Sequence, residues 1–333
     1  MACFGRRPHP FDTQPGLGRN GASRPLRPSA LAAALLPLVL TACGSSAAGD
    51  TSASREDPDT LTMAIIPSED AGSTAQHYKP LVKLIEDETG KKVVLQKATN
   101  YAAVIEAQRA HKAQIAVYGP LSYVVAKKSG VGVEPIARQL LTKGGTPGYW
   151  SYGITRGGNK DINSLSDFKG HKVCFVDENS TSGYLYPRAG LKKAGLKDGA
   201  YTKVMADSHD ASALSVAHGD CDAGFADNTM VDKLLIQKGK LKKGELKVVW
   251  KSPLIPSSPV EVSTDLSGTL RRQLADVFTK KANADYLKSK GYCKGDGCFI
   301  YGYWGYVPAK DSDYKTVRDV CATTGDPQCK AGS

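Results

Sequence analysis

The segment DENSTSGYLYP, residues 177–187, places hydroxyl side chains where they could bind an anion. Ser180, Thr181 and Ser182 stand in a row between KVCFVD, which predicts a buried strand, and a stretch that predicts a helix. The first N–H groups of a helix lack internal partners and carry the positive end of the helix dipole. We therefore expect the backbone N–H groups of Thr181, Ser182 and Gly183, together with the hydroxyls, to bind an oxyanion.

A capping role is the alternative for this segment, because serine is among the preferred residues at a helix N-cap. Capping accounts for one hydroxyl and leaves the other two unexplained. The turn contains no lysine or arginine. Neutral donors would select an anion by its shape and by the number of hydrogen bonds, whereas a lysine would act as a less discriminating point charge.

Two tyrosines end or begin elements in the preceding part of the chain. Tyr101 opens a predicted helix after Asn100, and Tyr118 ends a predicted strand before Gly119 and Pro120. Each hydroxyl could donate to the same anion, or each ring could pack in a core. For Tyr101 taken alone, packing is the better explanation.

The elements that must position these residues follow an α/β pattern from Leu61 onward. The short β-rich runs LTMAII, KVVLQKA and QIAVYG alternate with segments whose apolar residues have helical spacing, such as Leu81, Leu84 and Ile85. A second block of the same kind begins near Gly153. This alternation predicts mainly parallel sheets flanked by helices.

Two proline- and glycine-marked segments, GGTPGYWS and SPLIPSSP, bracket the second block. They predict two crossover strands joining two lobes, the first built from residues 60–150 and 259–333 and the second from residues 151–258. Ligands of open α/β sheets bind beyond the carboxyl ends of the strands. A cleft between the lobes would therefore collect the loops described above.

The N-terminal region has the layout of a secretory signal. Arginines precede the apolar run ALAAALLPLVL, which is too short to span a bilayer, and LTAC follows, ending at Cys43. LTAC resembles the bacterial lipobox, so we predict a lipoprotein signal peptide over residues 1–42, a lipid on Cys43 and a flexible tether over residues 43–59. The protein would be exported and lipid-anchored on the outer face of the cytoplasmic membrane. The alternative is a plain secretory signal with an incidental cysteine.

Six of the eight cysteines lie beyond the predicted lipidation site, and an even number in an exported chain indicates disulfides. Closeness in sequence favours two pairs, and the third pair follows by elimination. A metal site is the alternative, but CKGDGC lacks the CxxC spacing and has no paired histidines nearby. The favoured pairs are Cys293–Cys298, Cys321–Cys329 and Cys174–Cys221.

Charge and motifs exclude several classes of function. The formal net charge is +11, and removal of residues 1–42 leaves the chain basic, but the lysines and arginines are scattered as on solvated faces. No aromatic-basic motif indicates a nucleic acid partner. The sequence lacks HExxH and GxxxxGK[ST], and GxSxG is absent around Ser182, so we expect neither an enzyme nor a bound metal or cofactor. His209 and Asp210 are adjacent, which does not suit a catalytic relay.

Seven segments in order resemble the phosphonate/phosphite-binding proteins of ABC uptake transporters: NYAAVIEA, IAVYGPLSYV, TPGYWSYGIT, DENSTSGYLYP, DSHDASALSVAHG, DNTMVDKL and WKSPLIP. The resemblance runs from about Leu61 to about Pro259, and the cysteine-bearing C-terminal region shows less of it. It implies a two-lobed type II periplasmic-binding-protein fold that closes on a phosphorus oxyanion. It also implies ABC permease and ATPase subunits as partners of a monomeric binding protein.

The resemblance also implies roles for individual residues. By position, residues 180–182 match the hydroxyl cluster of the family, and Tyr101 and Tyr149 match its two anion-contacting tyrosines. His209 matches a histidine that family members carry near the ligand, although a lone histidine is also often structural.

Departures from the family pattern concern the tail of the ligand. Members that take aminophosphonates carry carboxylates where this chain has Met230 and Ser258, and a buried ammonium without a charged partner is costly. Asp227 could accept a proton from a P–OH group, or it could cap a strand end. We therefore expect phosphite, methylphosphonate or another phosphonate without an amine, or phosphate. A ligand-sensing protein for a membrane signalling partner and a catalytic relative acting on a phosphonate are the alternatives.

Overall fold

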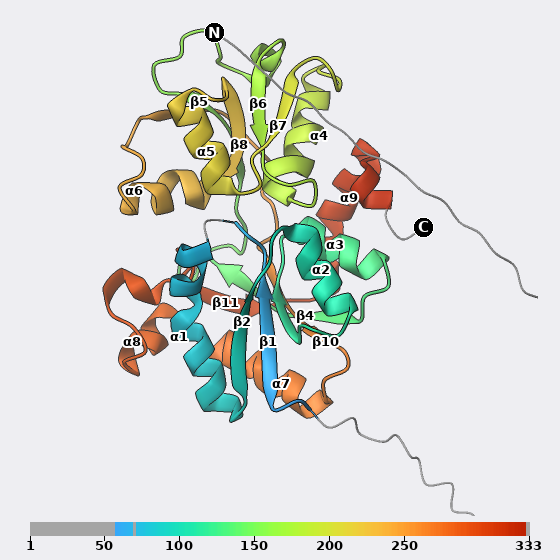
Figure 1. The fold of residues 1–333 in the computed structure, drawn as a ribbon, viewed down its shortest axis with the longest axis vertical. Helices are drawn as coiled ribbons and strands as arrows, with labels where there is room; N and C mark the ends of the chain where they lie inside the picture. The colour runs from blue at the N-terminus through green and yellow to red at the C-terminus, as the bar shows by residue number, and fades with distance from the viewer. Residues whose placement is uncertain (1–56, 69–70, 331–333) are drawn as a thin grey trace, which may run out of the picture. The chain divides into compact units, whose positions relative to one another are not determined.

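The computed structural model describes residues 57–68 and 71–330, which all lie in one compact unit. Two β-sheets organise this unit (Figure 1). In spatial order, the first sheet contains β11 (Gly305–Pro308), β4 (Val133–Leu140), β10 (Pro259–Ser263), β3 (Ile115–Val117), β1 (Thr60–Ile65) and β2 (Lys92–Lys97). The second contains β7 (Thr202–Met205), β6 (Lys172–Phe175), β8 (Ala223–Asp227), β5 (Ser151–Arg156) and β9 (Leu246–Lys251).

Both sheets are mixed. Strand β1 runs parallel to β2 and β3, and β6 runs parallel to β7 and β8. Strand β10 is antiparallel to both neighbours, as is β5. The predicted parallel pairing therefore holds for only part of each sheet. The chain crosses between the sheets twice, and it enters the second sheet on β5 and the first sheet on β10. These two strands start near the crossing, whereas their neighbours end there, so they are antiparallel to them.

Helices cover both faces of the first sheet (Figure 1). In β1, Leu61, Met63 and Ile65 belong to one core cluster and Ala64 to another, as the alternation of side chains along a strand requires. The first cluster includes residues of α1 (Ala71–Thr89), α7 (Gly268–Asp276), η4 (Val277–Lys281) and α8 (Ala284–Ser289). The second includes residues of α2 (Tyr101–Arg109) and α3 (Pro120–Lys128).

The second sheet is covered in the same way. Phe175 and Phe225 pack together, with ring centroids 5.1 Å apart, in a core that also contains Leu165 and Leu191. That face carries η1 (Leu165–Phe168), η2 (Thr181–Leu185) and α4 (Tyr186–Lys193). The other face carries α5 (His209–His218), η3 (Met230–Leu234) and α6 (Leu235–Gln237).

The two crossover segments pair with each other. Backbone hydrogen bonds join Tyr149 and Ile255 in both directions, at 3.0 and 2.9 Å. The chain leaves the first sheet after β4 and returns to it at β10, so these two segments connect the sheets side by side. This pairing fixes Tyr149 between the two sheets.

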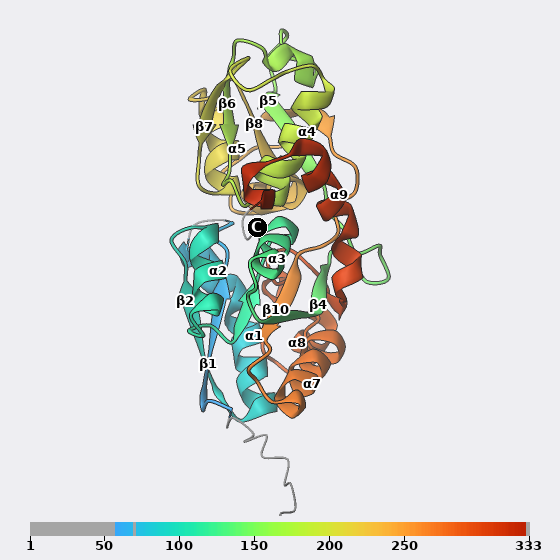
Figure 2. The same cartoon turned by 90° about the vertical axis from the view of Figure 1, so that its right-hand side faces the viewer.

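The C-terminal segment contacts elements of both sheets. After η5 (Gly295–Cys298), β11 and η6 (Asp311–Tyr314), helix α9 (Lys315–Thr324) packs against α3 and α4, and η7 (Pro327–Lys330) follows it (Figure 2). Disulfides join Cys174 to Cys221, Cys293 to Cys298 and Cys321 to Cys329, which confirms the favoured pairing.

Predictions for the signal peptide, for Cys43 and for most of the tether fall outside the described residues. Within residues 57–68 and 71–330, no helix combines the length and the apolarity needed to cross a bilayer.

Candidate ligand-binding site

A small cavity lies among the loops that follow strands of both sheets. The volume in which the centre of a water-sized sphere can lie is about 40 Å³. All eight residues predicted to contact a ligand line it. Segments far apart in the sequence therefore meet there, as the two-lobed prediction requires. The lining residues are Ile65, Ile66, Ser68, Thr74, Tyr78, Tyr101, Val117, Tyr118, Gly119, Gln139, Tyr149, Ser180, Thr181, Ser182, His209, Asp227, Ser258, Tyr301 and Tyr303.

The hydroxyls of Ser180 and Thr181 are oriented by the hydrogen bonds that their oxygens accept. Ser180 Oγ accepts from the backbone N–H of Gly183 at 3.0 Å, and Thr181 Oγ1 accepts from that of Leu121 at 2.7 Å. A hydroxyl whose oxygen accepts a bond keeps its own proton to donate. Both side chains can therefore donate to an anion.

The capping alternative also applies to this loop. Ser180 is the N-cap of η2, and its bond to Gly183 uses one of the backbone N–H groups expected to face the ligand. The prediction that the Gly183 N–H points outward is therefore wrong, because the cap closes back on it. Capping uses the hydroxyl oxygen of Ser180 as an acceptor, so the hydroxyl proton can still be donated to a ligand.

Three buried tyrosines bring hydroxyls to the cavity. Burial is the main cause that raises the pKa of Tyr101, Tyr149 and Tyr118, so all three stay neutral donors at physiological pH. The Tyr118 hydroxyl has no hydrogen-bond partner among the described residues, whereas the Tyr101 hydroxyl lies near the hydroxyls of Ser68 and Ser180. A buried hydroxyl without a partner is costly, and a polar ligand would remove that cost. Tyr101 also packs in a core, so both of its proposed roles are compatible.

His209 is a neutral donor. Its Nδ1 accepts a hydrogen bond from the backbone N–H of Asp227 at 3.0 Å, and burial lowers the pKa of the imidazole. A neutral ring that accepts at Nδ1 must carry its proton on Nε2. The 3.6 Å separation between Nδ1 and Oδ2 of Asp227 is therefore not an ion pair. Nε2–H remains as the donor of this residue.

Asp227 supplies the carboxylate of the cavity. Its Oδ1 accepts from the backbone N–H of Met230 at 2.9 Å, so the strand-end cap is present. Its Oδ2 accepts from the Tyr301 hydroxyl at 3.4 Å. Of the two positions linked to amine recognition, Ser258 lines the cavity, whereas Met230 is buried and does not line it.

Charge in the lining is nearly absent. No lysine or arginine belongs to it, and Asp227 is the acidic residue. An anion would be held here by hydroxyl and imidazole donors rather than by an ion pair. Beside Asp227, an anion oxygen that carries a proton would be favoured over one that does not.

The sequence predictions missed lining residues outside the recognised segments. Tyr301 and Tyr303 come from the C-terminal segment, Ser68 follows β1 and Gln139 lies in β4. The run IYGYWG was a usable signal, because a glycine between tyrosines marks a turn that can carry aromatic side chains.

Comparison with known proteins places the chain in a family. Residues 63–314 match the family model described as ABC transporter, phosphonate, periplasmic substrate-binding protein. The chain belongs to this family. It is accordingly an exported substrate-binding protein of an ABC transporter, and not an enzyme.

Two curated relatives support this membership. The chain is 43% identical over 311 residues to the phosphate-import protein PhnD of Mycolicibacterium smegmatis, covering 90% of this chain and 97% of that protein. It is 32% identical over 230 residues to the phosphonates-binding periplasmic protein of Escherichia coli, covering 67% and 66%.

Solved structures show the same fold. A binding protein component of an ABC phosphonate transporter from Pseudomonas aeruginosa superposes with a TM-score of 0.70 at 28% identity, covering 81% of this chain and 87% of that one. PhnD1 from Prochlorococcus marinus, in complex with methylphosphonate, gives a TM-score of 0.71 at 19% identity, covering 81% and 100%. The two-lobed type II periplasmic-binding-protein fold predicted from the sequence is thereby confirmed.

Proposed function

We propose that this protein captures a small phosphorus oxyanion without an amine for an ABC importer: phosphate, phosphite or methylphosphonate. One observation carries the proposal. The hydroxyls of residues 180–182, the buried phenols of Tyr101 and Tyr149 and the carboxylate of Asp227 line the same small cavity, without a cationic side chain. This set combines several neutral donors with one acceptor.

That combination suits a partly protonated anion. The P–O oxygens accept from Ser180, Thr181 and Tyr101, while a P–OH group donates to Asp227. Sulfate carries no proton at neutral pH, so its oxygens would face the carboxylate without a hydrogen bond, and charge repulsion would disfavour it. The site would therefore select against sulfate although the two anions have the same shape.

An aminophosphonate is disfavoured by the same lining. Asp227 is the one acidic residue of the lining, and in the proposed binding mode its carboxylate accepts from the P–OH group, so no charged partner is left for an ammonium. A buried ammonium needs a charged or well-bonded partner. Among the amine-free ligands we place phosphate first, because the relative with 43% identity is a phosphate-import protein.

The remaining parts of the proposal concern location and movement. Residues 1–42 would direct export, a lipid on Cys43 would hold the protein on the outer face of the cytoplasmic membrane, and residues 43–59 would tether it. Replacement Cys43→Ser should then release the protein into the soluble fraction.

The two lobes would close on the anion at the crossover segments and present both faces to the permease, with the ATPase behind it. One lobe is built from residues 60–150 and 259–333, and the other from residues 151–258.

Isothermal titration calorimetry of the purified protein tests the ligand. We expect binding of phosphate, phosphite or methylphosphonate at least about 100-fold tighter than that of sulfate or 2-aminoethylphosphonate, because each of the latter leaves a buried charge unpaired. Tightest binding of 2-aminoethylphosphonate would contradict the assignment, and so would equal binding of sulfate.

A further inference from the structure

The turn formed by residues 300–304 brings two aromatic rings into the cavity from the C-terminal segment. The side chains of Tyr301 and Tyr303 both line the cavity and are almost completely buried. Their rings are stacked, with centroids 6.3 Å apart and planes inclined by 13°. Together they form an aromatic wall on the side of Asp227, whose carboxylate the Tyr301 hydroxyl contacts.

The backbone of this turn holds the rings in place. Tyr301 and Gly302 both have left-handed backbone conformations, with φ of 51° and 76°, and the N–H of Tyr303 donates to the carbonyl of Ile300 at 3.0 Å. A tyrosine rarely adopts a positive φ, so its surroundings must impose this conformation. The tight reversal is what turns Tyr301 and Tyr303 to the same cavity.

Contacts from the second sheet fix the turn from the other side. Lys233 of η3 donates from Nζ to the carbonyl of Gly302 at 3.0 Å. A β-carbon at position 302 would lie 3.0 Å from Cγ2 of Thr229, a contact tighter than most, and the positive φ of Gly302 adds strain for any side chain there. The backbone of the turn that carries the aromatic wall is therefore held by Lys233 and packs against Thr229, and moving it would break the Lys233 hydrogen bond.

The size of the cavity determines how large a substituent on phosphorus can fit beside the aromatic wall. The centre of a water-sized sphere can occupy about 40 Å³ in it, so the cavity holds several water molecules. Tyr301 and Tyr303 line the side of the cavity next to Asp227, so a substituent of a bound oxyanion on that side would meet their rings. An ethyl or propyl substituent would have to displace Tyr301 or Tyr303, and overpacking a rigid cavity is unfavourable.

We propose that Tyr301 and Tyr303 determine ligand specificity by limiting the substituent on phosphorus to a hydroxyl, a hydrogen or a methyl group. This inference rests on the proposed function, since it concerns the same anion. It assigns the choice of tail to the C-terminal turn, whereas the head group is bound by the loop at residues 180–182.

Calorimetric titration of the unmodified protein with phosphate, methyl-, ethyl- and propylphosphonate is the first test. We expect affinity to fall by about 10- to 100-fold between methyl- and propylphosphonate, because the added carbons meet the aromatic wall. Propylphosphonate binding as tight as that of methylphosphonate would overturn the size limit. Binding of none of these anions would overturn the proposed function together with it.

The variants Tyr303→Ala and Tyr301→Gly are the second test. Each enlarges the cavity, and the second also removes a positive φ from a non-glycine residue. Propylphosphonate affinity should rise by about tenfold or more in either variant, while phosphate affinity falls by less than about tenfold. Loss of phosphate binding with no gain for propylphosphonate in a folded variant would show that the rings bind the head group, and would overturn the inference.

Tyr292→Ala is the matched control, because this tyrosine precedes the same turn, bonds to Asp87 and does not line the cavity. It should leave the whole phosphonate series unchanged. An equal gain for propylphosphonate in this control would show a general loosening of the segment and would overturn the role of the wall.

Discussion

Single hydroxyl groups carry the chemistry of the candidate site. Ser180 and Thr181 have their oxygens engaged by backbone N–H groups, so their protons are free for an anion. The Ser182 hydroxyl lies beside that of Tyr149, the Ser180 hydroxyl lies beside that of Tyr101, and the Tyr118 phenol has no partner among the described residues. The site is thus an arrangement of oriented neutral donors, and each donor can be removed separately.

Ser182→Ala and Ser180→Ala separate binding from capping. Each should weaken phosphate binding by about 10- to 100-fold, since a hydrogen bond to a charged group is lost. Ser180→Ala should also lower the free energy of unfolding of the empty protein by about 1 kcal/mol, because it removes the N-cap of η2. Ser182→Ala should change that free energy less.

Calorimetry and thermal unfolding measure the two effects, and Ser166→Ala, at an exposed position of η1, is the control. If Ser180→Ala and Ser182→Ala both left the phosphate affinity unchanged, these serines would not bind the anion, and Ser180 would act only as a helix cap.

His209 makes the stability of the empty protein depend on pH. Burial lowers its pKa in the folded state, whereas an unfolded histidine titrates near pH 6.5. Below about pH 6.5 the unfolded chain therefore binds more protons, and the free energy of unfolding falls with decreasing pH by up to about 1.4 kcal/mol per unit from this group. Above about pH 6.5 the histidine is neutral in both states, so this loss of stability is absent.

Urea unfolding between pH 5 and 8 tests this prediction with His209→Gln, which cannot take up the proton. The variant should lose that part of the slope. His218→Gln, at the exposed end of the same helix, should retain it. Identical slopes for the wild type and His209→Gln would contradict a neutral buried imidazole.

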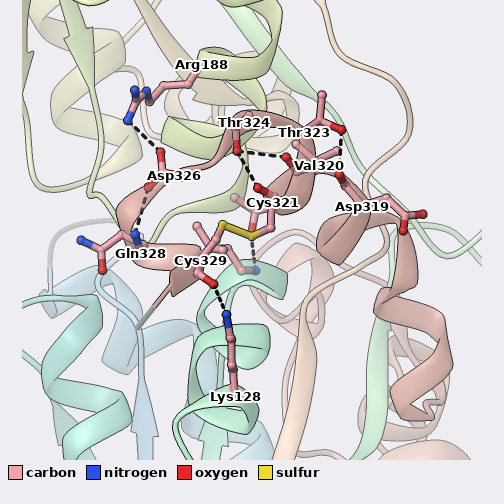
Figure 3. The surroundings of a disulfide bond; sticks show 12 residues. Lys128, Arg188, Asp319, Val320, Cys321, Thr323, Thr324, Asp326, Gln328 and Cys329 are labelled. Carbon is pink, nitrogen blue, oxygen red and sulfur yellow. Dashed lines mark hydrogen bonds and ion pairs between the residues drawn. A yellow bond between two sulfur atoms is a disulfide. The ribbon is translucent and has the colours of Figure 1, made fainter. Parts of the chain in front are cut away.

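At the scale of elements, the disulfide-closed C-terminal segment links helices from both sheets (Figure 3). Lys128 of α3 donates to the carbonyl of Cys329 at 2.7 Å, and Arg188 of α4 bonds to Asp326 at 2.8 Å. The Asp326 side chain is fully buried, whereas that of Asp198, the second partner of Arg188, is 73% exposed. One arginine thus makes a buried and an exposed ion pair.

Asp326→Asn should lower the free energy of unfolding by about 2 to 4 kcal/mol, because it leaves Arg188 without its buried partner. Asp198→Asn removes the exposed pair of the same arginine and should cost less than about 1 kcal/mol. Thermal unfolding measures both. Equal effects of the two replacements would contradict the view that the C-terminal segment is held by its buried contact.

The site loops could be predicted because their information is local. A strand, a polar turn and a helix follow one another within residues 172–193, so spacing alone placed the hydroxyls of residues 180–182 at a strand end. The path of residues 295–330 could not be predicted in this way. Its turn at Tyr301 depends on Lys233 and Thr229, and α9 depends on helices far away in sequence. Mixed strand directions were missed for the same reason, since they depend on where the chain crosses.

Across the whole molecule, hydrogen bonds join loops of the two sheets around the cavity. Leu121 donates to Thr181 at 2.7 Å, Ser122 donates to the carbonyl of Asn179 at 3.0 Å, and the N–H of His209 donates to the carbonyl of Ser68 at 3.0 Å. The loops that would bind the anion also hold the two sheets together. Ligand capture and lobe closure would therefore stabilise one another, as expected of a binding protein that delivers its ligand to a permease.

A crystal structure of the protein with bound phosphate tests the central claim most directly. The phosphate should lie in the cavity with its oxygens about 2.5 to 3.0 Å from the hydroxyls of Ser180, Thr181 and Tyr101. One further oxygen should lie within hydrogen-bond distance of the Asp227 carboxylate. A phosphate bound elsewhere, or one held in this cavity by a lysine or arginine side chain, would contradict the account.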